Sequence, residues 1–288
     1  MSTLGEFERK RPDSYDVSWC PGCGNFPLRD ALASAFKKLN LKPTDIAIVS
    51  GIGQAAKIVH YINTHGFHSL HGRAIPIASA LKASNPNLVV IAEGGDGDMY
   101  SEGGNHFLHG IRRNSDITVI IHNNQIYGLT KGQGSPTTMI GQHTTTQPFG
   151  VFEEPLNAIA LAIVLNASFV ARAYVGNKDY TADIIAQAIN HKGFAVVELF
   201  QPCVSFNKVN TYQWYSEHTY IMQNHDPKNK ILALQKALEN DPIPLGVFYI
   251  NNKKTFEENL MCYKQDNTPL FKRSTQIDKI KHFIDENF

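Results

Sequence analysis

The residues best suited to chemistry form two short motifs, Gly95-Asp96-Gly97 and Asn123-Asn124, which residues 98–122 separate. Each motif follows a short apolar run that predicts a buried strand, and the residues between them predict a helix. Because parallel strands joined by a crossover helix return their carboxyl ends to one edge of a sheet, we expect Asp96 and Asn124 to meet there.

A carboxylate and an amide at one sheet edge suit magnesium and a diphosphate. Mg²⁺ prefers octahedral oxygen ligands, which Asp96, Asn124, the backbone carbonyl of Ile126 and two diphosphate oxygens would supply. The glycines around Asp96 leave room for a phosphate, and a helix opening near Ser101 would point its amide groups at the anion. Either motif alone is typical of an ordinary turn, but together they predict a diphosphate and magnesium site.

The elements that must position these motifs alternate along the chain. Apolar and β-branched runs predict strands at 46–49, 88–92, 117–121, 169–173 and 195–200, and helical patterns lie over 26–39, 101–113 and 182–189. The strand segments show almost no polar alternation, which indicates burial on both faces. We therefore expect an α/β fold with a doubly wound, largely parallel sheet. Residues 135–155, rich in Thr, Gln, Gly and Pro, are expected to form an ordered loop near the site.

Three parts are expected along the chain. A polar leader occupies residues 1–15, and the cofactor-binding α/β domain occupies residues 16–207. Residues 208–288 form a C-terminal extension packed on the same domain, with a helix near 231–238 and one more strand near 245–250.

Charge and composition exclude several classes of protein. The 27 Lys and Arg residues nearly balance the 26 Asp and Glu residues, so there is no general electrostatic reason to expect nucleic acid or an anionic membrane as a partner. The N-terminal segment lacks the apolar region of a signal peptide, and the apolar runs are shorter than the roughly 20 residues that cross a bilayer. We expect a cytoplasmic protein whose four cysteines are reduced.

Further motifs occur in order from about Asp16 to Asn207. They are Trp19-Cys20-Pro21-Gly22-Cys23-Gly24, Ser50-Gly51-Ile52-Gly53, Leu70-His71-Gly72-Arg73, Gly94 to Asp98, Asn124 to Gln133, and Pro202-Cys203. In these motifs the chain resembles the β subunits of 2-oxoacid:ferredoxin oxidoreductases, particularly the 2-oxoglutarate-type members. In that family this subunit binds thiamine diphosphate and Mg²⁺, while a partner α subunit supplies the pyrimidine side of the cofactor pocket.

The resemblance also assigns roles to single residues. It implies Mg²⁺ ligation by Asp96, Asn124 and the Ile126 carbonyl. Catalytic roles fall to His71 and to Lys131, whose ammonium group would approach the 2-oxoacid carboxylate; an ordinary solvated loop lysine is the alternative for Lys131. The residues implied to line the cofactor are Ile52, Gly53, Gln54, Ala55, His71, Gly97, Asp98, Gly128 and Leu129.

The reaction that the resemblance implies is the oxidative decarboxylation of a 2-oxoacid, with 2-oxoglutarate favoured and pyruvate next. The products are acyl-CoA and CO₂, with one-electron transfer to ferredoxin, and the chain is expected to be inactive without its partner. Two alternatives stay open. One is a non-oxidative thiamine-dependent decarboxylase or synthase subunit, and the other is a non-catalytic scaffold that binds an iron-sulfur cluster or zinc.

The cysteines depart from the family pattern. The family commonly holds a [4Fe-4S] cluster with four cysteines, of which Cys20, Cys23 and Cys203 match three, but Gln54 stands where the remaining one is expected. An amide oxygen is a poor substitute for a thiolate. Three outcomes are open: a cluster with one non-cysteine ligand, no cluster, or a fourth thiolate supplied by Cys262. A zinc site or a purely structural turn is the alternative interpretation of the Cys20 and Cys23 pair.

Overall fold

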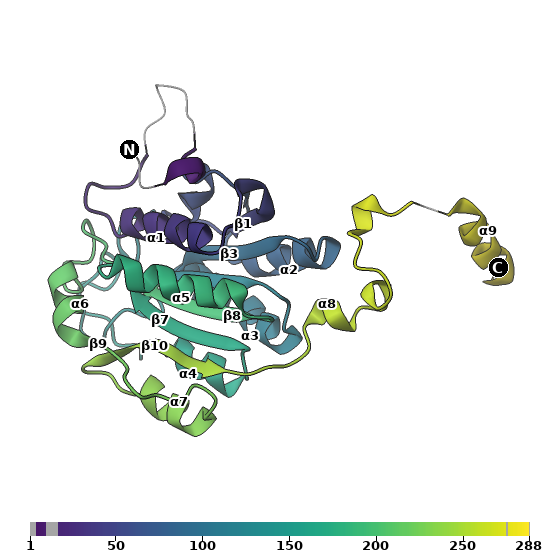
Figure 1. The fold of residues 1–288 in the computed structure, drawn as a ribbon. Coiled ribbons are helices and arrows are strands. Elements are labelled where there is room, and N and C mark those ends of the chain that lie inside the picture. The colour runs from purple at the N-terminus through teal and green to yellow at the C-terminus, as the bar shows by residue number, and fades with distance from the viewer. Residues whose placement is uncertain (1–3, 10–16, 275, 288) are drawn as a thin grey trace.

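A computed structural model describes residues 4–9, 17–274 and 276–287. Within them, an eight-stranded sheet in the order β2-β1-β3-β4-β8-β7-β10-β9 forms the centre of the molecule (Figure 1). Its strands are β1 (Ile46–Ser50), β2 (His65–His68), β3 (Val89–Gly95), β4 (Thr118–Asn123), β7 (Phe169–Tyr174), β8 (Ala195–Phe200), β9 (Thr219–Ile221) and β10 (Ile243–Ile250). The short strands β5 (Ile126–Tyr127) and β6 (Gln133–Gly134) pair separately.

The strand directions confirm a doubly wound, largely parallel sheet. From β2 to β7 every neighbouring pair is parallel. The C-terminal strand β10 runs antiparallel to β7 and parallel to β9, a reversal that the strand pattern alone did not predict. Strands β3 and β4, which precede the two motifs, are adjacent in the sheet, so their carboxyl ends share one edge.

Helices cover both faces of the sheet (Figure 1). The core clusters place α1 and α5 on one face and α2, α3, α4 and α7 on the other. The helix bounds are α1 (Asn25–Lys38), α2 (Ala74–Ser84), α3 (Gly104–Arg113), α4 (Ala158–Val164), α5 (Lys178–Asn190), α6 (Tyr212–His218), α7 (Lys230–Ala237), α8 (Phe256–Asn259) and α9 (Ile277–Asn287).

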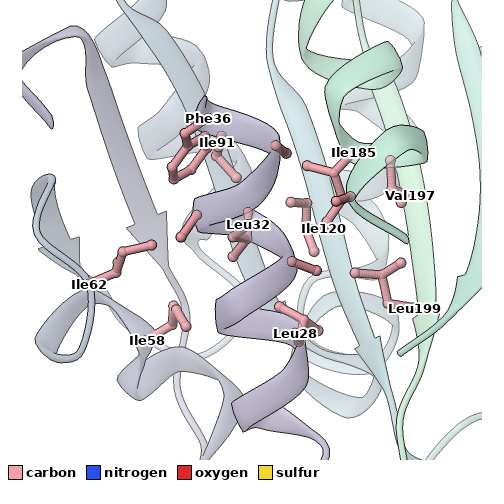
Figure 2. Packing of buried hydrophobic residues seen from close by; sticks show 14 of the residues in the cluster. Leu28, Leu32, Phe36, Ile58, Ile62, Ile91, Ile120, Ile185, Val197 and Leu199 are labelled. Carbon is pink, nitrogen blue, oxygen red and sulfur yellow. The ribbon is translucent and has the colours of Figure 1, made fainter. Parts of the chain in front are cut away.

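The packing of α1 shows why this helix forms where it does. Leu28, Leu32 and Phe36 recur every fourth residue, lie on one side of the helix and are completely buried. They pack in one cluster with the sheet residues Ile91 and Ile120 (Figure 2). Burial of each such side chain stabilises the fold by about 1.5–3 kcal/mol, so α1 fixes the position of the cysteine turn that precedes it.

The segment after β3 differs from the expected helix that opens near Ser101. A single π-helical turn, Gly97–Glu102, comes first, and α3 follows it. The Gly103 amide donates to the carbonyl of Asp98, five residues earlier, at 2.9 Å. Such turns are rare and occur mostly at functional sites. The helical backbone therefore begins directly after the acidic residue of the motif.

The described part of the leader contributes apolar side chains to the core. Leu4 and Phe7 are buried in the core, and the Phe7 ring lies 5.2 Å from that of Phe36. Residues 1–3 and 10–15 of the leader lie outside the described residues.

The C-terminal part divides into packed and projecting segments. Strands β9 and β10 join the sheet, and α7 packs against its face. Helix α9 has no buried residue and projects away from the body (Figure 1). No helix in the described ranges has both the length and the apolar character that crossing a bilayer requires.

Candidate functional site

The carboxylate of Asp96 lies just beyond the tip of β3 and is almost completely buried. Its Oδ2 atom accepts hydrogen bonds from Ser135 Oγ at 2.6 Å and from Thr137 Oγ1 at 2.5 Å. Burial raises the pKa of Asp96 to about 6, and these hydrogen bonds only partly oppose that effect. No cationic side chain in the described ranges lowers its pKa. A divalent cation would supply the missing positive charge.

A tight turn after β4 fixes the other two proposed magnesium ligands. Asn124 Oδ1 accepts a hydrogen bond from the Ile126 amide at 3.1 Å, and Asn207 Nδ2 donates to the Asn124 carbonyl at 3.1 Å. Gln125, which lies between Asn124 and Ile126, adopts a left-handed conformation with φ 58°, and this conformation turns the chain back sharply. The sequence thus presents an amide oxygen and a backbone carbonyl, both ligands that Mg²⁺ accepts.

One cavity of about 100 Å³ brings the expected cofactor residues together. Its lining includes both motifs, the turn after β1 and the start of the loop after β5, so segments far apart in the sequence meet at one sheet edge. The expected residues that line it are Ile52, Gly53, Gln54, Ala55, His71, Asp96, Gly97, Asp98, Asn124, Ile126, Gly128 and Leu129. A diphosphate and a magnesium ion fit this donor set, because glycines surround the same space as Asp96, a buried carboxylate with hydroxyl partners but no cationic partner in the described ranges.

Asp98 joins two loops of the cavity wall. Its Oδ1 atom accepts hydrogen bonds from the Gly72 amide at 2.8 Å and the Ile52 amide at 3.2 Å. Burial raises the pKa of Asp98, although these two bonds oppose the rise. A Cβ atom at Gly51 would lie only 1.7 Å from its Oδ2 atom. Only glycine fits at position 51 beside this carboxylate, which accepts hydrogen bonds from both loops.

His71 faces the cavity beside a second acidic residue. Its Nδ1 atom lies 2.8 Å from Asp98 Oδ1 and 3.3 Å from Glu102 Oε2. Tyr127 donates its hydroxyl proton to the Glu102 carboxylate, 3.1 Å from Oε2, and its ring lies 2.4 Å from where a Cβ of Gly97 would be. The imidazole is therefore oriented by carboxylates, as a group that holds or moves a proton requires.

The site includes residues that the sequence did not single out. Gly95, Tyr127 and Thr130 also line the cavity. Ser135 and Thr137, which bond Asp96, come from the loop expected only to lie near the site. The cluster Ser135-Pro136-Thr137-Thr138, which follows the second motif after residues 125–134, was the available signal, because hydroxyl groups often satisfy buried carboxylates.

Lys131 lies on the rim and does not line the cavity. It is exposed, follows the lining residues Leu129 and Thr130, and has a left-handed backbone with φ 75°. Its amide donates to the Gly128 carbonyl at 3.3 Å, which closes a turn. The turn holds the lysine outside the space where the diphosphate would lie.

Three cysteines gather where α1 begins and β8 ends. The Gly24 amide donates to the Pro202 carbonyl at 3.2 Å, which brings the first cysteine turn against Cys203. Burial raises the pKa of the Cys23 thiol to about 11, and the neighbouring thiols Cys203 and Cys20 raise it further. Ser205 Oγ donates to Cys20 Sγ at 3.0 Å. Cys20 and Cys203 therefore lie close enough to Cys23 to raise the pKa of its thiol.

The donors near these thiols do not fit a four-thiolate cluster. Trp19 Nε1 donates to the backbone carbonyl of Gln54 at 2.8 Å, and the Gln54 Oε1 atom is buried without a hydrogen-bond partner. The fourth position thus carries a neutral amide. In the part of the chain that the structure describes, no three His, Cys, Asp or Glu side chains are arranged to hold a metal ion.

Cys262 does not supply the missing thiolate, so this one of the three expected outcomes is wrong. The neighbouring Tyr263 donates its hydroxyl proton to the Ala83 carbonyl at 2.6 Å, at the end of α2. That end of α2 precedes β3 and lies at the amino edge of the sheet. Cys203 follows β8 at the carboxyl edge, and the turn with Cys20 and Cys23 lies against it, so the sheet separates Cys262 from these three cysteines.

Comparison with known families agrees with this geometry. Residues 50–199 match the family described as thiamine pyrophosphate enzyme, C-terminal TPP binding domain. Residues 203–265 match the family that describes the C-terminal part of the beta chain of pyruvate ferredoxin oxidoreductase.

Individual relatives cover most of the chain. The β subunit of 2-oxoacid:ferredoxin oxidoreductase 1 from Aeropyrum pernix is 43% identical, over 90% of this chain and 87% of the relative. The 2-oxoglutarate synthase subunit KorB from Methanocaldococcus jannaschii is 36% identical, over 87% of this chain and 93% of the relative. Among solved structures, the 2-oxoglutarate:ferredoxin oxidoreductase from Magnetococcus marinus, with 2-oxoglutarate, coenzyme A and succinyl-CoA bound, is similar with a TM-score of 0.89 and 32% identity, over 97% of this chain and 95% of that one.

Proposed function

Because the chain belongs to the β subunits of 2-oxoacid:ferredoxin oxidoreductases, we propose that it supplies the thiamine-diphosphate half of an active site that oxidatively decarboxylates 2-oxoglutarate. The products would be succinyl-CoA and CO₂, with electrons passed one at a time to ferredoxin. Pyruvate is the second substrate to test. The observation that supports the proposal most strongly is the single cavity shared by Asp96, Asn124, Ile126 and His71.

In this proposal the chain holds the diphosphate end of the cofactor. Asp96, the Asn124 amide and the Ile126 carbonyl would hold Mg²⁺, and the glycines of the cavity would admit the diphosphate. Thiamine diphosphate, once bound, supplies the electron sink that decarboxylation of a 2-oxoacid requires.

The chain's own residues would orient the reactants and hold protons. His71, oriented by Asp98 and Glu102, would hold or transfer a proton at its imidazole near the bound cofactor. Lys131 on the rim would attract the carboxylate of the incoming 2-oxoacid. Both roles depend on carboxylates and turns that fix each side chain before the substrate arrives.

The size of the cavity favours a shared active site. Small-molecule sites commonly enclose about 300–1,000 Å³, whereas this cavity measures about 100 Å³. It accommodates only part of a cofactor as large as thiamine diphosphate. The partner α subunit would enclose the remainder and complete the substrate pocket.

The donors around the cysteines bear on the route of the electrons. Three thiols and the Gln54 amide do not make a complete cubane site. That same feature favours one alternative, a thiamine-dependent subunit that decarboxylates 2-oxoacids without oxidation.

The test is reconstitution of this chain with its α subunit. We expect CoA-dependent reduction of a viologen dye on addition of 2-oxoglutarate, a slower rate with pyruvate, and background rates from the isolated chain. Release of CO₂ with an aldehyde product and no dye reduction would support the non-oxidative alternative. Full activity of the isolated chain would exclude a shared active site.

A further inference from the structure

A second cavity of about 390 Å³ opens near the same edge of the sheet, behind the loop that contains Thr137. Its lining includes Asn123, Thr137, Arg172 and Glu198, and it has no residue in common with the lining of the cofactor cavity. Its volume falls in the range of about 300–1,000 Å³ that is typical of small-molecule sites. The activity proposed above makes no use of it.

The most unusual group in this cavity is the buried guanidinium of Arg172. Its side chain is only 8% exposed and lies between the rings of Phe200 and Phe248, 5.0 and 5.5 Å from their centroids. Its contact with Glu198 is long, at 3.5 Å, and its Nε atom is buried without a hydrogen-bond partner. A guanidinium has five N–H donors, and leaving them unpaired inside a protein is costly. An anionic acceptor from a ligand would satisfy them.

The nearest carboxylate, that of Glu198, contacts Arg172 only through Oε1, at 3.5 Å. Glu198 Oε2 accepts a hydrogen bond from Asn123 Nδ2 at 2.7 Å. Because Glu198 makes only the long contact with Arg172 and Arg172 Nε has no hydrogen-bond partner, a ligand carboxylate would supply acceptors that Arg172 lacks. Paired donors in a planar fork match carboxylates well.

The other walls define the rest of the ligand. Leu156, Phe200 and Trp214 present apolar and aromatic surface, and Trp214 is stacked on His218 with ring centroids 4.5 Å apart and an interplanar angle of 8°. Glu239 and Asp241 also line the cavity. Their negative charge disfavours a ligand with several negative charges.

We propose that this cavity binds a monocarboxylate with a flat apolar body, its carboxylate on Arg172 and its body against Trp214. An aryl carboxylate such as benzoate is the simplest ligand of this class. Because the two cavities have separate linings, benzoate should bind equally well when the protein is saturated with thiamine diphosphate and Mg²⁺. The proposal is therefore independent of the proposed function.

The test is titration of the full chain with benzoate, measured by calorimetry and by the fluorescence of tryptophan, since Trp214 is one of two tryptophans in the chain. We expect saturable binding at one site, and at least tenfold weaker binding of the neutral analogue benzamide. The double variant R172Q/E198Q removes both buried charges together and should weaken benzoate binding at least tenfold. Arg112→Gln, on an exposed face of α3, should leave it unchanged.

Trp214→Leu provides a second variant if the double variant does not fold, because Trp214 is only partly buried. It should weaken benzoate binding at least threefold while the circular dichroism spectrum stays that of the unaltered chain. The proposal is overturned if benzoate does not saturate, if benzamide binds equally well, if folded variants bind benzoate normally, or if thiamine diphosphate with Mg²⁺ displaces it.

Discussion

Asp96 is a buried negative charge for which the described residues provide hydroxyl groups but no cation. Asp96→Asn keeps the shape of the side chain and removes that charge. We expect it to weaken Mg²⁺-dependent binding of thiamine diphosphate by at least about a hundredfold. Mutation of a residue that only hydrogen-bonds a metal ligand already lowers metal affinity or activity about 10–100-fold. Isothermal calorimetry measures this.

The stability of the Asp96→Asn variant without metal or cofactor shows whether the substitution disturbs the fold. Asp96→Asn should not lower the melting temperature of the cofactor-free chain, because it relieves the cost of a buried charge. The control is Asp179→Asn at the exposed start of α5. Normal cofactor affinity in the folded Asp96→Asn variant would show that the metal ligand lies elsewhere.

At Gly51 the addition of one methyl group should destabilise the fold. Gly51→Ala would place its Cβ 1.7 Å from Asp98 Oδ2, whereas a Cβ at Gly104 meets nothing within 4 Å. We expect Gly51→Ala to destabilise the chain by about 1–3 kcal/mol, as overpacking commonly does, and Gly104→Ala to be neutral or stabilising by up to about 1 kcal/mol. Urea unfolding compares them, and equal stabilities would contradict the packing of Asp98.

Gln54 is the residue that separates this chain from a four-cysteine site. Gln54→Cys would add a fourth thiolate beside Trp19 and the cysteine turn. After anaerobic reconstitution we expect iron to approach about four atoms per chain and visible absorbance to rise above that of the unaltered chain. Gln187→Cys, on the exposed side of α5, should change neither. Little or no iron in all three proteins would show that these thiols form no cluster site.

At the scale of elements, the C-terminal segment consists of an anchored part and a projecting part. The anchored part is held by the bond from the Asp116 amide to Glu257 at 3.0 Å, the bond from the Phe256 amide to Asn114 at 3.0 Å, and the Tyr263 hydroxyl bond to α2. Helix α9 buries no residue. The two parts should therefore contribute very differently to stability.

Two truncations test this difference. A chain that ends at Arg273 should melt at the same temperature as the full chain, because none of the removed residues that the structure describes is buried. A chain that ends at Asn251 loses the anchored part and should melt at least about 4 °C lower, given about 1 kcal/mol for each hydrogen bond. Differential scanning calorimetry decides. A large loss on removal of α9 alone would show that this helix packs on the body in solution.

Sequence periodicity predicted the elements better than their directions. The runs at 46–49, 117–121 and 195–200 became buried strands because apolar β-branched residues without polar alternation suit a sheet covered on both faces. The reversal of β10 relative to β7 was not predictable, because strand pairing over long sequence distances leaves no local pattern. The π turn after Asp96 was also missed, because the helical pattern of this segment does not reveal the five-residue spacing of its hydrogen bond.

The site itself was predictable to the extent that backbone turns define it. Asp96, Asn124 and Ile126 follow adjacent strands, so their meeting could be inferred from topology. The hydroxyl groups of Ser135 and Thr137 could not, because a loop brings them back over the sheet. The position of Cys262 also depended on the whole fold, since only the sheet shows that it lies at the opposite edge.

At the scale of the whole molecule, the small cofactor cavity predicts that assembly and cofactor binding are coupled. If the α subunit encloses the part of thiamine diphosphate that this chain leaves exposed, its addition should tighten cofactor binding at least about tenfold, which corresponds to about 1.4 kcal/mol. Calorimetry with and without the α subunit measures the difference. Equal affinities would indicate that this chain encloses the cofactor unaided.

The sheet order also determines when the site can first exist during synthesis. Strand β8 pairs with β4, and the segment after β8 brings Cys203 to a turn made near the start of the chain. Most of the α/β domain must therefore leave the ribosome before Cys203 can approach the cysteine turn near the start of the chain, and before β4 can pair with both β3 and β8. Long-range parallel pairing of this kind is slow and leaves unpaired strand edges for a time. Newly made chains should depend on chaperones until β8 has emerged, and on cofactor loading only afterwards.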